Sequence, residues 1–441
     1  MINRLLMFFV NLMQKYLPDP FTIAWLISLV VVGMAMGITH TPISQIINDW
    51  GAGFFGIMAF AMQMTMVIVS GYALAAAPIV RRFLRFVAGI PKTPAQTVFF
   101  IGFVSMILYY LNWGLGLIAG GLLAREAAKL HPDVDFRLLV TAAFSGIIIT
   151  HGGMSASVPL LINTKGHFLE KEIGLIPLSQ TIFHPQAIFI TVTLAIVIPL
   201  VLLLMIPKKE DTVLADPSLF ADDVVAPPAS GKKKEIADYL DSSWILNATL
   251  GVMGAAYVVM FFAKGGALNL NILIFAFIVA GIIAHGTLIN YTKAVSKGAG
   301  AAAGIILQYP FYAGIMGIMQ GSGLVVWISD LLLHAATYDT MEIYCYFSSL
   351  IISIFVPSAG GHWVVQAPFM LPAAAKLGVE PWKVAMGVAW GESIWNVVCP
   401  FWALPLLAIA NISIRDLIGF SVLLFLIGNV VALTGIVMFA H

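Results

Sequence analysis

Residues 146–161 read GIIITHGGMSASVPLL, a polar interruption between two long apolar runs. Its centre places His151 and the pair Gly152-Gly153 where a lipid-facing helix would carry only apolar side chains. In a bilayer every backbone N–H and C=O group must find a partner within the protein, so non-helical backbone persists only where it lines a protein cavity. The stretch therefore predicts a membrane span that is broken around an internal site.

The composition of the whole chain is that of a polytopic membrane protein. Of its 441 residues, 60% are hydrophobic and only 10% are charged, whereas soluble domains carry about 25% charged residues. The net charge of +1 gives no reason to expect a nucleic-acid partner. Cys345 and Cys399 lie in apolar segments without disulfide or metal-ligand spacing, so both are expected to be small core residues.

Two apolar segments, 97–129 and 341–376, are too long for one simple span, which takes about 20 residues. Each breaks near its centre, at residues 112–114 and 357–361, and we expect both to be re-entrant helical hairpins. The remaining apolar segments predict single spans at 21–39, 51–77, 138–163, 186–207, 243–262, 270–290, 299–319, 382–410 and 414–439.

The positions of the basic residues favour the hairpins over pairs of short spans. With both hairpins entering and leaving on one side and the N-terminus in the cytoplasm, the only basic residues outside are Lys165, Lys171, Lys264, Lys376 and Lys383. This asymmetry follows the positive-inside rule, and it places the C-terminus on the periplasmic side. If only the first hairpin crossed the membrane, every later loop would change sides and the asymmetry would be lost.

One stretch, residues 208–242, has a soluble composition, rich in charge, Pro, Ala and Ser, and it predicts a cytoplasmic linker. It separates a first half, 1–207, from an extra span at 243–262 and a second half, 263–441. The N-terminal residues MINRLLMFFVNLMQKYLPDP have apolar side chains at helical spacing and no cleavage site, so they predict an interfacial amphipathic helix.

The two halves repeat one order of hairpin and broken span. REAAKL at 125–130 corresponds to PAAAKL at 372–377, and GIIITHGGMSASVPLL corresponds to ESIWNVVCPFWALPLL at 392–407. Because the extra span reverses direction, the second copy enters the membrane from the opposite side. We therefore expect an inverted repeat, as in many secondary transporters. The broken spans are 138–163 in the first half and 382–410 in the second.

Polar residues gather at the breaks and form the candidate substrate and ion site. The ends of half-helices expose N–H groups that can hold a carboxylate without an arginine, and carbonyl groups that can hold a small cation. The full predicted site is Asn112, Trp113, Gly114, Thr150, His151, Gly152, Gly153, Ser155, Ser157, Ser358, Gly360, Gly361, His362, Glu392, Ser393 and Asn396.

The ionisable members of this set each have a functional and a structural interpretation. Burial in a membrane is costly, so Glu392 is expected to carry a coupled proton, and its alternative role is to tie spans together. His151 and His362 either donate to a substrate carboxylate, titrate during transport, or bond a carbonyl freed by the break. No metal-ligand spacing and no catalytic motif occurs, so we expect neither a metal site nor an enzyme.

Five stretches, spread over essentially the whole chain, carry a resemblance to a known family. They are KYLPDPFTIAWLISL, LNWGLGLIAG, THGGMSASVPLL, FVPSAGGHWVVQAP and GESIWNVVCPFWALPLL. They resemble the bacterial short-chain fatty acid transporter family of the AtoE type. The resemblance implies uptake of short fatty acids, such as butyrate or acetoacetate, across the bacterial inner membrane. The wider ion transporter superfamily, which includes dicarboxylate and citrate carriers, implies a scaffold, a moving elevator-type domain and a homodimer.

We therefore expect an all-α polytopic membrane protein that imports short-chain monocarboxylates together with a cation and without another cofactor. Dicarboxylate relatives carry Ser-Asn-Thr motifs at both hairpin tips, and this chain does not, which leaves the cation as H⁺ or Na⁺. A carrier of a dicarboxylate or an amino acid is the alternative within transport, and a channel or membrane sensor is the alternative outside it. The expected partners are the substrate, the lipid bilayer and a second copy of the chain.

Overall fold

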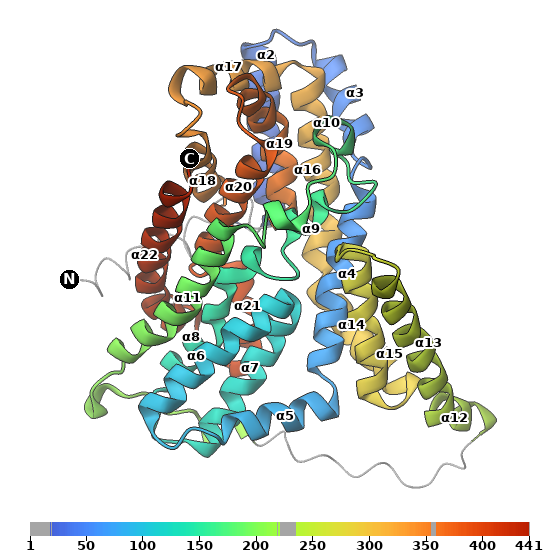
Figure 1. Ribbon diagram of the computed structural model, residues 1–441, viewed down its shortest axis with the longest axis vertical. Coiled ribbons are helices and arrows are strands. Elements are labelled where there is room, and N and C mark those ends of the chain that lie inside the picture. Colours follow the sequence, from blue (N-terminus) through green and yellow to red (C-terminus); the bar gives the residue numbers. More distant parts are fainter. Residues whose placement is uncertain (1–17, 19, 218, 221–234, 354–358, 441) are drawn as a thin grey trace.

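The computed structural model describes residues 18, 20–217, 219–220, 235–353 and 359–440, and in these ranges the ordered elements are all helical (Figure 1). Among these residues, seven helices are long and apolar enough to cross a membrane, or eight if one bent pair counts as a single span. The chain is thus a multi-span membrane protein. The predicted N-terminal amphipathic helix lies outside the described residues.

The first half contains an antiparallel helix pair and an interrupted span. Elements marked η are 3₁₀ helices. The helices of the first half are α2 (Pro20–Gly37), α3 (Ile43–Gly53), α4 (Met58–Ala75), α5 (Pro78–Ala88), α6 (Pro94–Leu111), α7 (Trp113–Leu130), α8 (Phe136–Phe144), η1 (Ser145–Gly152), α9 (Ser157–Ile162), α10 (Glu170–Ile173), η2 (Leu178–Gln180) and α11 (Pro185–Leu204). The pair is α6 and α7, and the interrupted span runs from α8 through η1 to α9.

The second half follows the linker and has a similar series of elements. Its helices, preceded by η3 (Lys209–Asp211) and α12 (Ile236–Asp241) in the linker, are α13 (Trp244–Ala263), α14 (Leu270–His285), α15 (Leu288–Ala301), α16 (Ala303–Gly321), α17 (Leu324–Ala335), α18 (Met341–Ile352), α19 (Ala359–Lys376), α20 (Pro381–Asn396), α21 (Pro400–Ala410) and α22 (Ile414–Met438). Figure 1 shows α6 and α7 in the lower part of the molecule and α18 and α19 in the upper part.

The helices break at residues whose chemistry favours a break. Asn112 ends α6 with an extended backbone, and its Oδ1 accepts a hydrogen bond from Leu115 N at 2.9 Å, as a helix N-cap does. Pro400 begins α21, and proline suits a first helical position because it lacks the N–H group that would be left unpaired there. The break in the first half follows Gly152, where η1 ends and residues 153–156 leave helical geometry.

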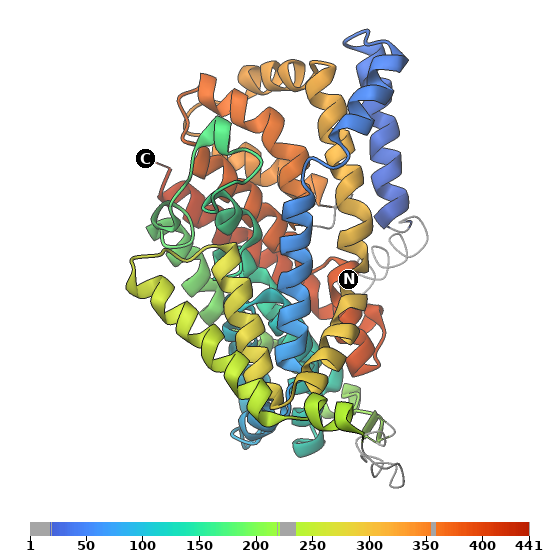
Figure 2. The same ribbon diagram turned by 90° about the vertical axis from the view of Figure 1, so that its right-hand side faces the viewer.

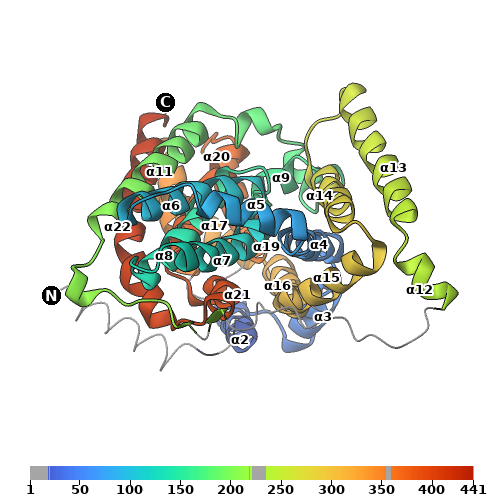
Figure 3. The ribbon, with the colours of Figure 1, turned by 90° about the horizontal axis from the view of Figure 1, so that it is seen from below.

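The interrupted span of the first half lies almost wholly inside the protein. In its most apolar window, between Phe136 and Ile162, 94% of the residues are buried, against 17% for the segment Ile236–Ala263. This difference has a physical reason, because a 3₁₀ stretch and an open turn leave backbone groups that lipid cannot satisfy. Figures 2 and 3 show the contrast: α13 slants along the outside of the molecule, at its edge when seen from below.

The helices pack as two groups. In one group α16 packs against α2 and α3, and α4 packs against α14 and α15. In the other, the pair α6–α7 surrounds the interrupted span with α11 and α21, and α20 packs against α18, α19 and η1. The two groups meet mainly where α4 contacts α7 and where α16 contacts α19.

Three predicted spans differ from the helices observed. The span 51–77 begins only at Met58, because the chain turns between α3 and α4. The span 270–290 ends at His285, because Gly286 adopts a left-handed conformation with φ of 70°. The span 299–319 is α16 with the end of α15, and the two helices meet at a bend of 46° that apolarity alone does not reveal.

The described start of the linker is docked on the first half. The N–H group of Phe136 donates to the carbonyl of Val213 at 2.8 Å, and Val213 N donates to Oδ2 of Asp135 at 2.9 Å. Arg137 donates to the carbonyl of Asp211 at 2.9 Å. Residues 211–213 therefore belong structurally to the end of the molecule where α7 leads into α8.

The turn between α6 and α7 packs directly against α4 with no side chain between the two backbones. A Cβ atom added at Gly71 of α4 would lie 2.5 Å from Leu115 N, and one added at Gly114 would lie 2.9 Å from the Cα of Ile68. Real Cβ atoms do not approach backbone so closely, so both glycines are required for this contact between the two helix groups.

This packing predicts that Gly71→Ala and Gly114→Ala lower the apparent melting temperature of the purified protein, since overpacking costs about 1–3 kcal/mol. The matched control is Gly33→Ala in α2, where an added Cβ meets nothing within 4 Å. That control should be neutral or stabilising, because alanine is favoured over glycine in a helix by about 1 kcal/mol. Wild-type melting of Gly71→Ala would contradict the backbone contact.

Candidate functional site

A small internal cavity lies between the turn of the α6–α7 pair and the two interrupted spans. Its volume is about 30 Å³, which at roughly 10–15 Å³ per enclosed water corresponds to about two water molecules. The cavity is therefore small in this conformation. It is lined by Met64, Tyr109, Trp113, Leu117, Ile147, Thr150, His151, Ser155, Ser157, Ile305, Tyr309, Asn396 and Trp402.

Three of these lining residues carry buried hydrogen-bond donors without partners. Tyr109 OH, Trp113 Nε1 and Trp402 Nε1 make no hydrogen bond to any described residue, although each atom is buried. The indole rings of Trp113 and Trp402 pack edge to face with centroids 5.5 Å apart. A buried donor that is left unpaired costs about 1–3 kcal/mol, so such a cluster requires an explanation.

A buried hydrogen bond between a histidine and a glutamate joins the two interrupted spans beside this cavity. The Nε2 atom of His151, in η1, is hydrogen-bonded to Oε2 of Glu392, in α20, and their side chains are only 2% and 1% exposed. Asn396 donates from Nδ2 to the other carboxylate oxygen at 3.0 Å. His151 and Asn396 line the cavity and Glu392 does not, so the carboxylate lies behind them.

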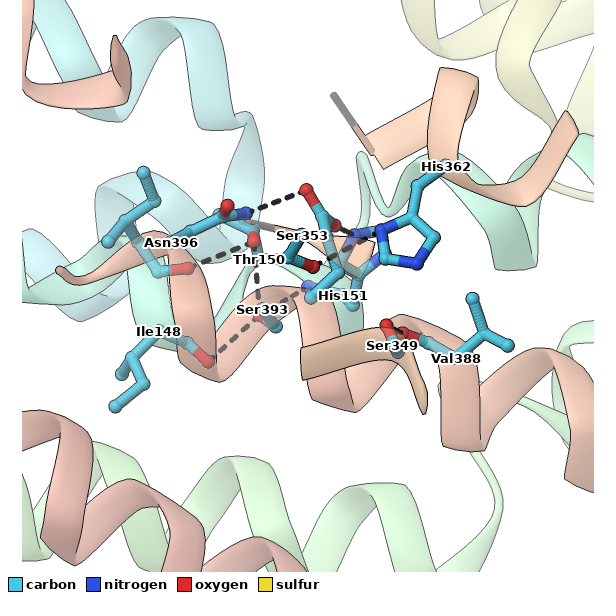
Figure 4. Close-up of polar contacts among 11 residues, drawn as sticks. Ile148, Thr150, His151, Ser349, Ser353, His362, Val388, Ser393 and Asn396 are labelled. Carbon is cyan, nitrogen blue, oxygen red and sulfur yellow. Dashed lines mark hydrogen bonds and ion pairs between the residues drawn. The ribbon is translucent and has the colours of Figure 1, made fainter. Parts of the chain in front are cut away.

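The hydroxyl of Ser393 makes a second link between the spans (Figure 4). It donates to the carbonyl of Ile148 at 2.9 Å and lies 3.2 Å from the hydroxyl of Thr150. Thr150 in turn donates to the carbonyl of Ile147 at 2.9 Å. Because a 3₁₀ helix leaves carbonyl groups poorly satisfied, these two hydroxyls compensate the backbone of η1.

The structure brings most of the predicted site residues to one place. Six of them, Trp113, Thr150, His151, Ser155, Ser157 and Asn396, line the cavity. Ser155 also accepts a hydrogen bond from Trp113 N at 2.9 Å, which holds the turn of the α6–α7 pair against the interrupted span. Asn112 and Gly114 shape that turn, and Glu392 and Ser393 form the layer behind the cavity.

The predicted glycines do not line this cavity. A Cβ at Gly152 would lie 2.0 Å from Oγ1 of Thr191, and one at Gly153 would lie 2.5 Å from the carbonyl of Tyr110. Gly360 packs in the same way against Phe60. These glycines therefore allow close packing of the helices. In the sequence, a glycine with this role looks the same as a glycine that lines a site.

The remaining predicted residues belong to the second hairpin. His362 is fully buried in α19, and its Nδ1 is 3.2 Å from the hydroxyl of Ser353 (Figure 4). Gly361 is also buried, and neither residue borders the cavity. Ser358 lies outside the described residues.

Sequence reasoning missed the cavity residues that come from regular helices. Tyr109 lies one turn before the break at Asn112, and this closeness to a break could have identified it as a candidate site residue. Met64 of α4 and Ile305 and Tyr309 of α16 carried no signal, because each lies in an uninterrupted apolar helix.

Within the described ranges no three His, Cys, Asp or Glu side chains cluster as metal ligands.

Comparison with known proteins gives a consistent family. Residues 1–439 match the protein family described as "Short chain fatty acid transporter". A protein of Escherichia coli (strain K12) named "Putative short-chain fatty acid transporter" is 39% identical over 441 residues, which is 100% of both chains. A protein of the same name from Haemophilus influenzae is 39% identical over 428 residues, covering 95% of this chain and 96% of its own.

Among solved structures, the crystal structure of the Alcanivorax borkumensis YdaH transporter is similar in fold. The TM-score is 0.61 at 15% sequence identity, and the match covers 96% of this chain and 98% of that one. Its description reports an unusual topology. At this identity the likeness concerns the fold alone. The family and both named relatives are transporters, not enzymes.

Proposed function

The chain belongs to the short-chain fatty acid transporter family, and from this membership we propose that it imports short-chain monocarboxylates together with a proton. The family supports transport of such substrates. The coupling ion, the residues involved and the movement are inferred below from the arrangement around the cavity.

The observation that carries the proposal is the set of three unpaired donors among the residues that line the cavity. A carboxylate placed there would accept hydrogen bonds from Tyr109, Trp113 and Trp402, which removes the cost of leaving these donors unpaired. The aliphatic part of the acid would contact Met64 and Ile305. Because the cavity has room for only about two waters, substrate binding must widen it.

The same lining favours one carboxylate over two. Neither Lys nor Arg contributes to the cavity wall in the described part of the chain. A second carboxylate on the substrate would therefore face apolar side chains without a counter-charge, and burying an unpaired charge is costly. A dicarboxylate carrier is thus the weaker candidate. An amino-acid carrier is weaker too, because the buried carboxylate Glu392 lies behind the wall and is already engaged by His151 and Asn396.

The His151–Glu392 pair supplies a rationale for proton coupling. With neutral His151 and ionised Glu392 the pair carries one negative charge, and a second anion beside it is disfavoured. A proton on His151 makes the pair neutral and leaves Nδ1, which has no partner among the described residues, free to donate to the substrate. Substrate and proton then bind together and cross the membrane without net charge. This avoids the cost of moving one charge against the membrane potential, which is about 2.3 kcal/mol per 100 mV.

An internal repeat is supported by equivalent contacts in the two halves. Ser105 of α6 donates to the carbonyl of Ala143 at 2.6 Å, and Ser349 of α18 donates to the carbonyl of Val388 at 2.6 Å. Just after each carbonyl, Gly146 and Gly391 pack against the same serine. These contacts pair Gly146 with Gly391, one residue away from the register that the sequence alignment favours.

An elevator-like movement is supported by where the cavity lies. Its wall is shared between the two helix groups, with α4 and α16 on one side and the hairpin and interrupted spans on the other. The helices α5 and α17 also contact the hairpins through ion pairs of opposite polarity, Arg85–Glu126 at 3.0 Å and Asp330–Lys376 at 2.8 Å. Sliding of the second group against the first would carry the cavity across the membrane.

Counterflow in proteoliposomes tests the function. Labelled butyrate should exchange against unlabelled internal butyrate, and Trp402→Phe should raise the half-saturating concentration about tenfold, because one hydrogen bond to a charged group contributes about 1.5 kcal/mol. Trp244→Phe, at a 69% exposed position of α13, is the matched control and should behave as wild type. A conductive leak without exchange would indicate a channel, and absence of any flux would indicate a sensor.

Coupling is tested by uptake under an imposed pH gradient in sodium-free buffer. Acid outside should accelerate uptake by the wild type, and Glu392→Gln should lose that response, because His151 then lacks the charge that holds its proton. The control is Glu210→Gln, at a 75% exposed linker position. Uptake that requires sodium and ignores the pH gradient would contradict proton coupling, as would a Glu392→Gln variant that still responds to pH.

A further inference from the structure

A second buried carboxyl group, Glu342, lies apart from the cavity at the start of α18. Its exposed fraction is 4%. Its Oε1 accepts a hydrogen bond from Nε2 of Gln186, the second residue of α11, at 2.8 Å. Gln186 itself is fully buried. The contact therefore joins the second hairpin to a helix of the first half, and neither residue has a part in the mechanism proposed above.

The two side chains leave a matched pair of unpaired oxygens. Oε2 of Glu342 and Oε1 of Gln186 are both buried and have no hydrogen-bond partner within the described ranges. Both atoms are acceptors if Glu342 is ionised, so neither can satisfy the other. A proton on Oε2 supplies the missing donor. The carboxyl and the amide would then form two hydrogen bonds, from the amide N–H to the carboxyl C=O and from the carboxyl O–H to the amide C=O.

The charged groups around Glu342 do not replace that proton. Lys383 of α20 is the basic residue whose charge favours the ionised form of Glu342. The ammonium group of Lys383, however, is hydrogen-bonded to the carbonyl of Ala440 at 3.1 Å and to Tyr338 OH at 3.3 Å. Lys383 also faces Glu380 at 3.8 Å. His184, at the start of α11, packs against Trp382 with ring centroids 4.3 Å apart, and burial together with the charge of Lys383 lowers its pKa.

We propose that Glu342 is a second proton-binding site, that it holds a proton in this conformation by pairing with Gln186, and that it gives up this proton during the transport cycle. The inference rests on the proposed transport function. The proton would leave past Lys383, whose two neighbours reach the surface: Tyr338 is 40% exposed and the Glu380 side chain is 50% exposed. With one proton on the His151–Glu392 pair and one on Glu342, each monocarboxylate would enter with a net positive charge.

Infrared absorption of the purified protein in lipid at neutral pH tests the protonation directly. A carbonyl band of a protonated carboxyl group should be present in the wild type and in Glu210→Gln, and absent in Glu342→Gln. Gln186→Leu should keep the band but shift it to higher frequency, because the carboxyl loses its amide partner. An unchanged band in Glu342→Gln would overturn the proposal.

Release of the proton is tested by butyrate uptake into proteoliposomes with an imposed inside-negative potential. The wild type should be accelerated by the potential, whereas Glu342→Gln should still exchange butyrate in counterflow but lose the acceleration. A variant that loses the infrared band and keeps the response to potential would show that Glu342 is permanently protonated, which overturns the release step. If the wild type moves no butyrate at all, the transport function fails while the infrared result still decides protonation.

Discussion

The arrangement depends on one constraint, the need of every backbone polar group inside a membrane to find a partner within the protein. Two spans are interrupted, and they satisfy part of this need by packing against each other. Ser393 bonds the carbonyl of Ile148 across the contact, and Ser105 and Ser349 bond carbonyls of the spans from the neighbouring hairpin helices. Breaking a helix in this way leaves a polar interior that a continuous helix would not have.

The polar interior separates two kinds of group. Neutral donors, Tyr109 and the two indoles of Trp113 and Trp402, border the cavity, while the carboxylate of Glu392 is held behind His151. In the proposed mechanism a monocarboxylate would meet donors first and a negative charge only through the imidazole. This layering would link affinity for the anion to protonation of the pair, because the proton on His151 that makes the pair neutral would also provide a further donor, Nδ1, to the substrate.

The sequence predicted the breaks better than the cavity. Glycine, asparagine and proline are local signals of a helix break, so the breaks near Gly152, Asn112 and Pro400 could be predicted from the sequence. Only about half of the cavity lining could be predicted from the sequence. Tyr309, for example, lies in an uninterrupted helix, and only tertiary packing brings it to the cavity. Glu342 was overlooked for the same reason, because its partner Gln186 lies in the other half of the chain and only the fold brings the two together.

The central claim is that a short monocarboxylate and a proton bind together at the His151–Glu392 pair. It is tested most directly by adding butyrate to purified protein in weakly buffered, sodium-free solution and following the pH with an indicator dye. One proton should be taken up for each butyrate bound, and Glu392→Gln should take up none. Binding of butyrate to the wild type without any proton uptake would contradict the account.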